Sequence, residues 1–139
     1  MATFSKFNSF VEALAEKVHN LGSDTLKVML TNSAPSAANT VKANITEIAA
    51  GNGYPAGGIA VTVVSSGQVG GTYKLIVSEA TITASGGSIG LFRYVVLYND
   101  TATNDELIAY GDYGSAITLS NGEPFIIRFD ETEGAVKIV

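Results

Sequence analysis

The chain contains no cysteine and no tryptophan, and only one of its 139 residues is a histidine, His19. Without cysteine it has neither disulfides nor thiolate ligands for zinc, so its stability must come from packing or assembly. A lone histidine has no second histidine with which to form a catalytic dyad. Charged residues make up only 15% of the chain, whereas hydrophobic residues make up 46%. From these deficits we predict a protein that is not an enzyme and holds neither a metal nor another cofactor.

The charge balance is acidic, because 13 Asp and Glu outnumber eight Lys and Arg and give a net charge of −5. Affinity for nucleic acid depends mainly on basic residues that neutralise phosphates, and anionic membranes attract the same residues. No stretch reaches the roughly 18 apolar residues that a membrane-spanning helix needs. Charged residues also interrupt the N-terminal apolar positions, which is unlike a signal peptide. We therefore expect neither nucleic acid nor a membrane as a partner.

The N-terminal region has apolar residues at helical spacing, which predicts an amphipathic helix over residues 4–21. The apolar stripe consists of Phe4, Phe7, Phe10, Val11, Leu14, Ala15, Val18 and Leu21. Gly22 is well placed to end this helix. His19 falls on the polar side, so we expect it to be exposed.

After Gly22 the apolar period changes from 3.6 to 2, which is typical of strands. Leu26, Val28 and Leu30 alternate with Lys27, Met29 and Thr31, and further short runs follow. We predict strands near 59–65, 72–78, 80–84, 89–98, 106–112, 115–119, 124–130 and 135–139. The pattern favours one all-β domain over residues 1–139, a β-sandwich or jelly-roll-like fold with one N-terminal α-helix and strands over about 25–139.

Two details of the strand region carry further expectations. The run 89–98 is apolar on both faces, which predicts a central strand covered on both sides. Strict alternation puts Phe92 on the same face as Val96 and Tyr98. The dipeptide Asn121-Gly122 between two apolar runs predicts a hairpin that joins them.

The glycine-rich segment 51–58, Gly-Asn-Gly-Tyr-Pro-Ala-Gly-Gly, predicts an irregular surface loop. A phosphate-binding loop is disfavoured because no Lys or Arg lies between Lys42 and Lys74. Tyr54 and Pro55 in this loop are candidate partner-binding residues, since interfaces favour tyrosine.

The aromatic residues of the N-terminal stripe are the other candidates for partner binding. Phe4, Phe7 and Phe10 crowd the start of the predicted helix. Two roles are compatible with the pattern: the rings pack on the chain's own sheet, or they bind a neighbouring protein.

Five segments that span most of the chain resemble small virion proteins of tailed bacteriophages, in particular the cement (decoration) proteins of phage heads. They read FSKFNSFVEALAEKVHNL, LKVMLTNSAPSAANTV, ITEIAAGNGYPAGG, GGSIGLFRYVVLYNDT and YGDYGSAITLSNGEPFIIRF. The resemblance implies a jelly-roll or related β fold and a dimer or trimer on the outer capsid surface. There it would bind the major capsid protein and clamp neighbouring capsomers, after assembly in the host cytoplasm. One known type of cement protein has a helix-free N-terminal arm, and the predicted helix departs from that type.

Two other functions are compatible with the sequence. A phage tail or head-fibre component shares the same general character and differs in copy number per particle. A carbohydrate-binding β-sandwich module is the second alternative, because Tyr54, Tyr110 and Tyr113 lie near predicted loops.

Overall fold

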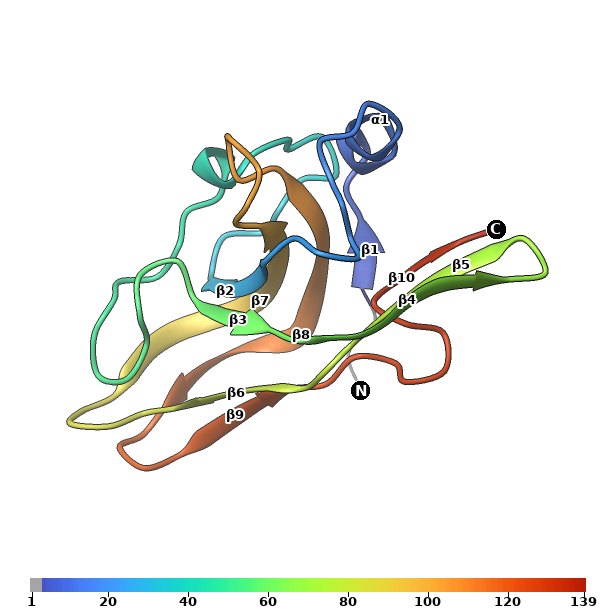
Figure 1. The fold of residues 1–139 in the computed structure, drawn as a ribbon. Coiled ribbons are helices and arrows are strands. Elements are labelled where there is room, and N and C mark those ends of the chain that lie inside the picture. The colour runs from blue at the N-terminus through green and yellow to red at the C-terminus, as the bar shows by residue number, and fades with distance from the viewer. Residues whose placement is uncertain (1–3) are drawn as a thin grey trace.

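The computed structural model describes residues 4–139, and antiparallel strands dominate it (Figure 1). It contains ten strands in three sheets, one α-helix and one short 3₁₀ helix. The predicted all-β class with a single N-terminal α-helix is confirmed. Strand positions agree closely with the predicted ones. The runs predicted at 106–112 and 115–119 form one long strand, and the run predicted at 59–65 is divided between two.

The largest sheet has five strands in the order β1-β8-β7-β2-β3. In that order they are β1 (Phe4–Lys6), β8 (Leu107–Leu119), β7 (Ile89–Asn99), β2 (Leu26–Thr31) and β3 (Ile59–Val61). A second sheet has the order β10-β5-β4, with β10 (Val136–Ile138), β5 (Thr72–Val77) and β4 (Val63–Val69). A third sheet pairs β6 (Ala80–Thr83) with β9 (Pro124–Ile127).

The middle of the five-stranded sheet is buried on both faces. One hydrophobic cluster joins it to the two smaller sheets and includes Leu30 of β2 and Leu97 of β7. Met29 and Val96, their neighbours in the sequence, belong to a second cluster. Successive residues of a strand point to opposite faces, so the two clusters lie on opposite sides of the sheet. The prediction that strand 89–98 is central is therefore confirmed. Its second half, from Val95, is buried on both faces as predicted, whereas Gly90 and Leu91 near its start are exposed.

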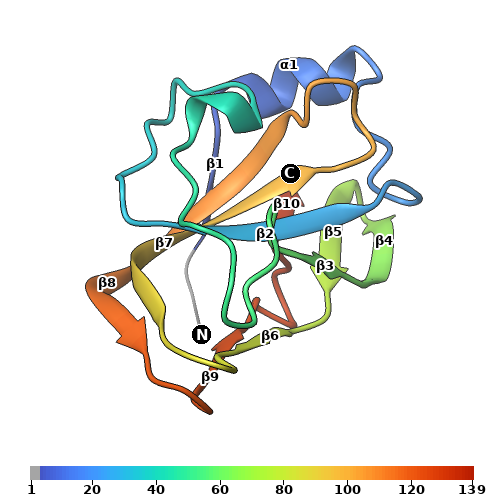
Figure 2. The same ribbon diagram turned by 90° about the vertical axis from the view of Figure 1, so that its left-hand side faces the viewer.

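The helices and the two-stranded sheet lie at opposite ends of the molecule. Figure 2 shows α1 (Ser9–Ala15) and the 3₁₀ helix η1 (Lys42–Asn44) together at one end, with β6 and β9 at the other. Ile45, which directly follows η1, packs against the second hydrophobic cluster. The long connection from β2 to β3 therefore helps to cover one face of the central sheet.

The helix predicted over 4–21 is much shorter in the structure, where α1 covers only Ser9–Ala15. Phe4–Lys6 instead form β1, which pairs with β8 so that Phe4 lies opposite Gly111. The backbone nitrogen of Phe7 also donates to the carbonyl oxygen of Ile108 over 3.0 Å. These residues obtain their backbone hydrogen bonds from the sheet, which removes the need for a helix there.

The helix also ends earlier than predicted, at Ala15, and Lys17 takes the place that Gly22 was predicted to have after its end. Lys17 has a positive φ of 67°. Its nitrogen donates to the Leu14 carbonyl over 3.3 Å, and the nitrogen of Val18 donates to the Ala13 carbonyl over 2.8 Å. This pair of bonds is the Schellman motif, which satisfies the last carbonyls of a helix and is usually built on glycine.

Two further predictions about the strands are wrong. Phe92 packs in the same cluster as Val95, because the pairing of β7 with β8 shifts register between Phe92 and Tyr94 and breaks the period of two. The turn at Asn121-Gly122 does not form a hairpin: β8 precedes it in the five-stranded sheet, whereas β9 after it pairs with β6. The chain reverses direction at this turn, and β9, which follows the turn, belongs to a different sheet from β8.

Candidate functional site

The aromatic residues predicted to bind a partner are mostly internal. Phe7 and Phe10 are fully buried, and the Phe7 ring lies 4.7 Å from the ring of Tyr110. Phe4 is half-buried, with its ring centre 4.8 Å from that of Phe129. Of the two roles compatible with the sequence, packing within the chain is the one that Phe7 and Phe10 perform in the structure.

Tyr54, the tyrosine of the glycine-rich loop, anchors that loop to the central sheet. Its side chain is only 1% exposed. The hydroxyl donates to Glu47 Oε2 over 2.6 Å and accepts from the backbone nitrogen of Leu30 over 3.0 Å. Burial raises the pKa of the Tyr54 hydroxyl, and the hydrogen bond to Glu47 adds to this shift. The prediction that Tyr54 is a surface contact residue is corrected, whereas Pro55 beside it is exposed.

The glycines of this loop explain why it lies so close to the sheet. Gly58 has a φ of +79°, and a Cβ placed on it would lie 1.8 Å from the carbonyl oxygen of Val28. Only a residue without a side chain fits at that distance. The segment is therefore irregular, as predicted, but it is packed against β2.

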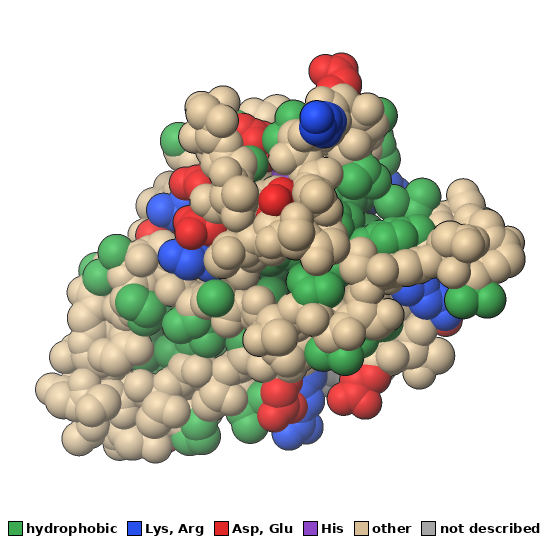
Figure 3. All heavy atoms as spheres, in the orientation of Figure 1, with side chains coloured by type: hydrophobic (Ala, Val, Ile, Leu, Met, Phe, Trp, Pro, Cys, Tyr) green, Lys and Arg blue, Asp and Glu red, His purple; other side chains and the backbone are tan. Residues whose placement is uncertain are grey.

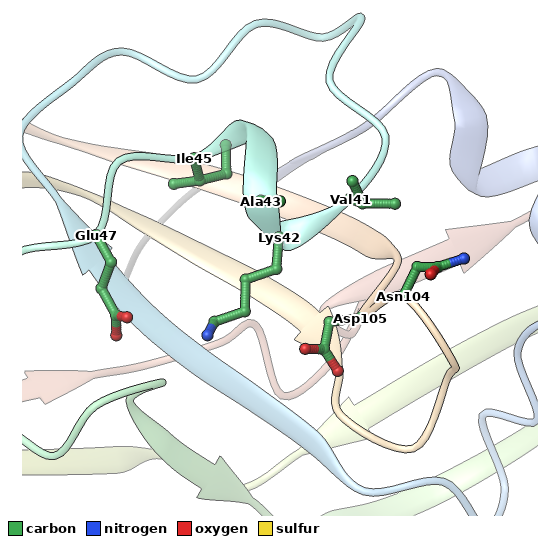
Figure 4. A pocket seen from close by; sticks show the side chains of 7 residues that line it. All are labelled: Val41, Lys42, Ala43, Ile45, Glu47, Asn104 and Asp105. Atoms are coloured by element: carbon green, nitrogen blue, oxygen red, sulfur yellow. The ribbon is translucent and has the colours of Figure 1, made fainter.

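A cavity of about 510 Å³ lies between η1 and the connection from β7 to β8. It is lined by Val41, Lys42, Ala43, Ile45, Glu47, Asn104 and Asp105 (Figure 4). The Lys42 ammonium points between the carboxylates of Glu47 and Asp105 (Figure 4) and lies 5.7 Å from the centre of the Tyr98 ring. Charges of both signs face one another here, so the cavity concentrates neither sign.

Polar atoms near this cavity stabilise the chain itself. Glu47 Oε2, besides accepting from Tyr54, accepts from the nitrogen of Gly57 over 2.7 Å. The Tyr98 hydroxyl donates to the carbonyl oxygen of Gly57 over 2.6 Å. Burial raises the pKa of this hydroxyl, with nearby carboxylates adding to the shift. These bonds attach the glycine-rich loop to the central sheet.

His19 belongs to a buried polar cluster that sequence reasoning missed. The prediction that it is exposed is wrong, because its side chain is only 5% exposed. Its ring stacks on Phe10 at 5.5 Å, and its Nδ1 lies 2.9 Å from the side-chain nitrogen of Asn99. Burial lowers the pKa of His19, while the carboxylates of Glu106 and Asp24 oppose this shift. Asn99 lies 80 positions along the chain, so no local pattern could reveal the contact.

A second cavity, of about 590 Å³, lies between the end of α1 and the three-stranded sheet. Its lining is mainly apolar and includes Leu14 of α1 and Ile138 of β10. Within it, the hydroxyls of Ser66 and Tyr73 bond to each other over 2.7 Å. This cavity therefore separates the helix from the sheet that contains β4.

The tyrosines that suggested a carbohydrate site do not share a face. Tyr54 is buried, and Tyr110 is half-buried against Phe7 and the second hydrophobic cluster. Tyr113 is 55% exposed, and its ring lies 5.5 Å from that of Phe125 in the main cluster. The three rings therefore do not form a single platform for a sugar.

The most exposed large hydrophobic side chains of any strand lie on β4. Val64 is 66% exposed and Val69 is 86% exposed. β4 is the outer strand of its sheet, and it projects with β5 from the body of the molecule (Figure 1). Figure 3 shows that charged side chains are sparse on the projecting end of this ribbon.

Three findings concern ligands and relatives of the chain. Within residues 4–139, no group of three or more His, Asp or Glu side chains is placed to hold a metal ion. None of the helices in that range is long and apolar enough to cross a membrane. No protein-family model matches the chain, and no match was found among curated proteins or solved structures.

Proposed function

We propose that the chain is a structural virion protein, a cement protein that binds the outer surface of a phage head and stabilises contacts between capsomers. Its partners are the major capsid protein and further copies of itself. Support comes from the five segments that resemble virion proteins and from the way the described polar groups are used. Tyr54, Glu47, His19 and Asn99 all form hydrogen bonds within the chain, so these groups hold the fold together.

The observation that carries this proposal is the contrast between the body and its projecting ribbon. The middle of the central sheet is covered on both faces, whereas β4 exposes Val64 and Val69 at the edge of its sheet. A cement protein needs a rigid body and adhesive surfaces, and each contact can be weak. Many copies on one shell then add up to a large stabilisation.

The proposal is tested by mixing the purified protein with expanded empty heads that carry only the major capsid protein. Saturable binding is expected, together with a higher temperature of head disruption. Heads that have not yet expanded are the control, and binding to them should be weaker. Absence of binding to expanded heads, with no change in their heat resistance, contradicts the proposal.

The alternative within virions is a tail or head-fibre component. The ratio of this chain to the major capsid protein in purified particles separates the two. A cement protein is present in numbers comparable to the capsid protein, whereas a tail part is far rarer. The carbohydrate-binding alternative is disfavoured by the burial of Tyr54 and by the separation of Tyr110 from Tyr113.

A further inference from the structure

β4 is an edge strand with one hydrogen-bonded neighbour. In the order β10-β5-β4 it pairs with β5 only, so the backbone groups along its outer side have no strand to bond to. The residues Ser65–Val69 keep a regular register with β5, and the irregularity lies between Val63 and Ser65. Residues 64–69 are all exposed. A regular, exposed edge of this kind is a template for another strand.

Natural edge strands are commonly protected by short length, charge or proline, and β4 has none of these. Its seven residues make it the longest edge strand of residues 4–139, since β1, β3 and β10 have three residues each and β6 and β9 have four. No charged residue and no proline occurs anywhere from Ile59 to Tyr73. By contrast, β9 begins with Pro124 and is followed by Arg128.

We propose that β4 pairs antiparallel with β4 of a second copy of this chain, giving one continuous six-stranded sheet across a two-fold axis. The proposal rests on the proposed function, because it names the surface through which the cement protein joins copies of itself. An antiparallel strand is complementary to its own copy, so the contact closes after two chains.

Charge favours a second copy as the occupant of this edge. The chain has a net charge of −5, and two copies approach most easily where neither is charged. β4 provides such a stretch, and Gly67 at the centre of its regular part has no side chain to obstruct the pairing. Val69 near one end supplies apolar area that pairing would cover.

Cysteine cross-linking tests the pairing directly, because the chain has no cysteine of its own. A Cβ at Gly67 meets nothing within 4 Å, so Gly67→Cys should fold normally. Cα atoms opposite each other in an antiparallel pair are about 4.5–5.5 Å apart, within the range of a disulfide. Mild oxidation should therefore produce a covalent dimer from Gly67→Cys, and from Ser66→Cys or Gln68→Cys if the register is shifted.

Gly90→Cys is the matched control. Gly90 also lies in a strand, β7, is exposed, and has nothing within 4 Å of its added Cβ. It is not on the β4 edge and should cross-link slowly. The proposal is overturned if none of the three β4 variants cross-links faster than Gly90→Cys.

Sedimentation of the unmodified protein supplies the second readout. The wild-type chain should sediment as a dimer, and Val69→Lys should shift it toward monomer, because each dimer would then bring two new charges to one edge. Val11→Lys is the control, since Val11 is 51% exposed on α1 and receives the same change. A monomeric wild type, or a dimer that both variants leave intact, contradicts the pairing.

The same variants separate this inference from the proposed function. A monomeric chain that still binds expanded heads would contradict β4 pairing and leave the cement role standing. A dimer that cross-links through Gly67→Cys but does not bind expanded heads would support the pairing and contradict the cement role. A partner's strand on β4 would appear as Gly67→Cys cross-linking to a cysteine placed in the capsid protein, with none between copies of this chain.

Discussion

Asn99 donates from its side-chain nitrogen to Nδ1 of His19 over 2.9 Å, and the rest of the cluster fixes the direction of this bond. The side-chain oxygen of Asn99 accepts from the backbone nitrogens of Thr101 and Ala102 over 2.9 and 3.2 Å. The amide orientation is thereby set, and its nitrogen also donates to Asp24 Oδ2 over 2.7 Å. His19 Nδ1 must accept, so the neutral ring carries its proton on Nε2.

Protonation of His19 should destabilise the protein. The folded pKa of His19 lies below its ordinary value because the ring is buried, so the unfolded chain binds the proton more readily. The stability that neutral His19 contributes is present above the unfolded pKa of about 6.5 and is lost as the pH falls below it. The midpoint temperature of thermal unfolding should therefore decrease when the pH is lowered from about 7.5 to about 5.5. The same pH change should lower the midpoint temperature of His19→Gln by less.

The lone histidine makes this pKa directly measurable. Only one imidazole ring contributes signals to a proton NMR titration, so their assignment to His19 is unambiguous. A titration midpoint at or above about 6.5 would contradict the link between burial and pH dependence.

Tyr54→Phe should destabilise the fold by about 1–3 kcal/mol, because it leaves the buried nitrogen of Leu30 without an acceptor. Urea denaturation measures this loss as a lower midpoint at an unchanged slope. Tyr113→Phe is the control, since that side chain is 55% exposed, and its effect should stay within about 0.5 kcal/mol. Equal effects of the two changes would count against Tyr54 as the anchor of its loop.

Phe7→Ala should lower the free energy of unfolding by about 3–5 kcal/mol, because the ring is fully buried and its removal leaves a cavity. Val11→Ala, at an exposed position on the neighbouring helix, should change it by less than about 0.5 kcal/mol. Chemical denaturation of the isolated protein gives both values. If Phe7→Ala leaves the free energy of unfolding unchanged but prevents assembly, the ring acts at an interface and its packing does not stabilise the fold.

Lys17→Gly should stabilise the protein by about 0.5–1 kcal/mol. Lys17 follows the end of α1 with a φ of 67°, where a side chain is strained and glycine is not. Lys17→Ala removes the same charge but keeps a Cβ, so it should give little gain. Thermal unfolding of the two variants distinguishes backbone strain from charge, and a similar rise in both would assign the effect to charge.

Gly58→Ala should prevent folding or reduce stability severely, since its Cβ would lie 1.8 Å from the carbonyl oxygen of Val28. Gly71→Ala is a matched comparison: Gly71 has a φ of +86°, similar to the +79° of Gly58, but nothing lies within 4 Å of its added Cβ. It should incur only the conformational strain of about 1–2 kcal/mol. Expression and circular dichroism report the difference, and equal tolerance of both would show that the loop can move away from β2.

Local patterns predicted the strands well because alternation is a property of consecutive residues. The run from Ile89 to Tyr98 is apolar on both faces, and β7 is indeed central. The face of Phe92 was not predictable, since one irregular step in the pairing with β8 reverses the alternation. Gly90 precedes Phe92 by two residues, but a single glycine in an apolar run does not show where the pairing becomes irregular.

The remaining errors have a common physical cause, which is competition from distant residues. Phe4–Lys6 belong to a run whose apolar residues have helical spacing, yet their backbone hydrogen bonds come from β8, more than 100 positions away. The turn at Asn121-Gly122 reverses the chain, but β6 and not β8 provides the partner for β9. In the apolar pattern of the sequence His19 falls on the polar side of the predicted helix, yet in the structure it is buried with Asn99 as the hydrogen-bond partner of its ring. None of these partners can be inferred from neighbouring residues.

The pairing of Phe4 with Gly111 has a consequence for how the chain is made. A ribosome delivers β1 long before the strand that must bind it, so β1 stays unpaired until about 100 further residues have been synthesised. The central sheet can be completed only after residue 111 and its neighbours have emerged. Contacts this distant slow folding, because a long loop must close before any pairing energy is gained. Nascent chains that stall before this point would leave their first strand available to chaperones.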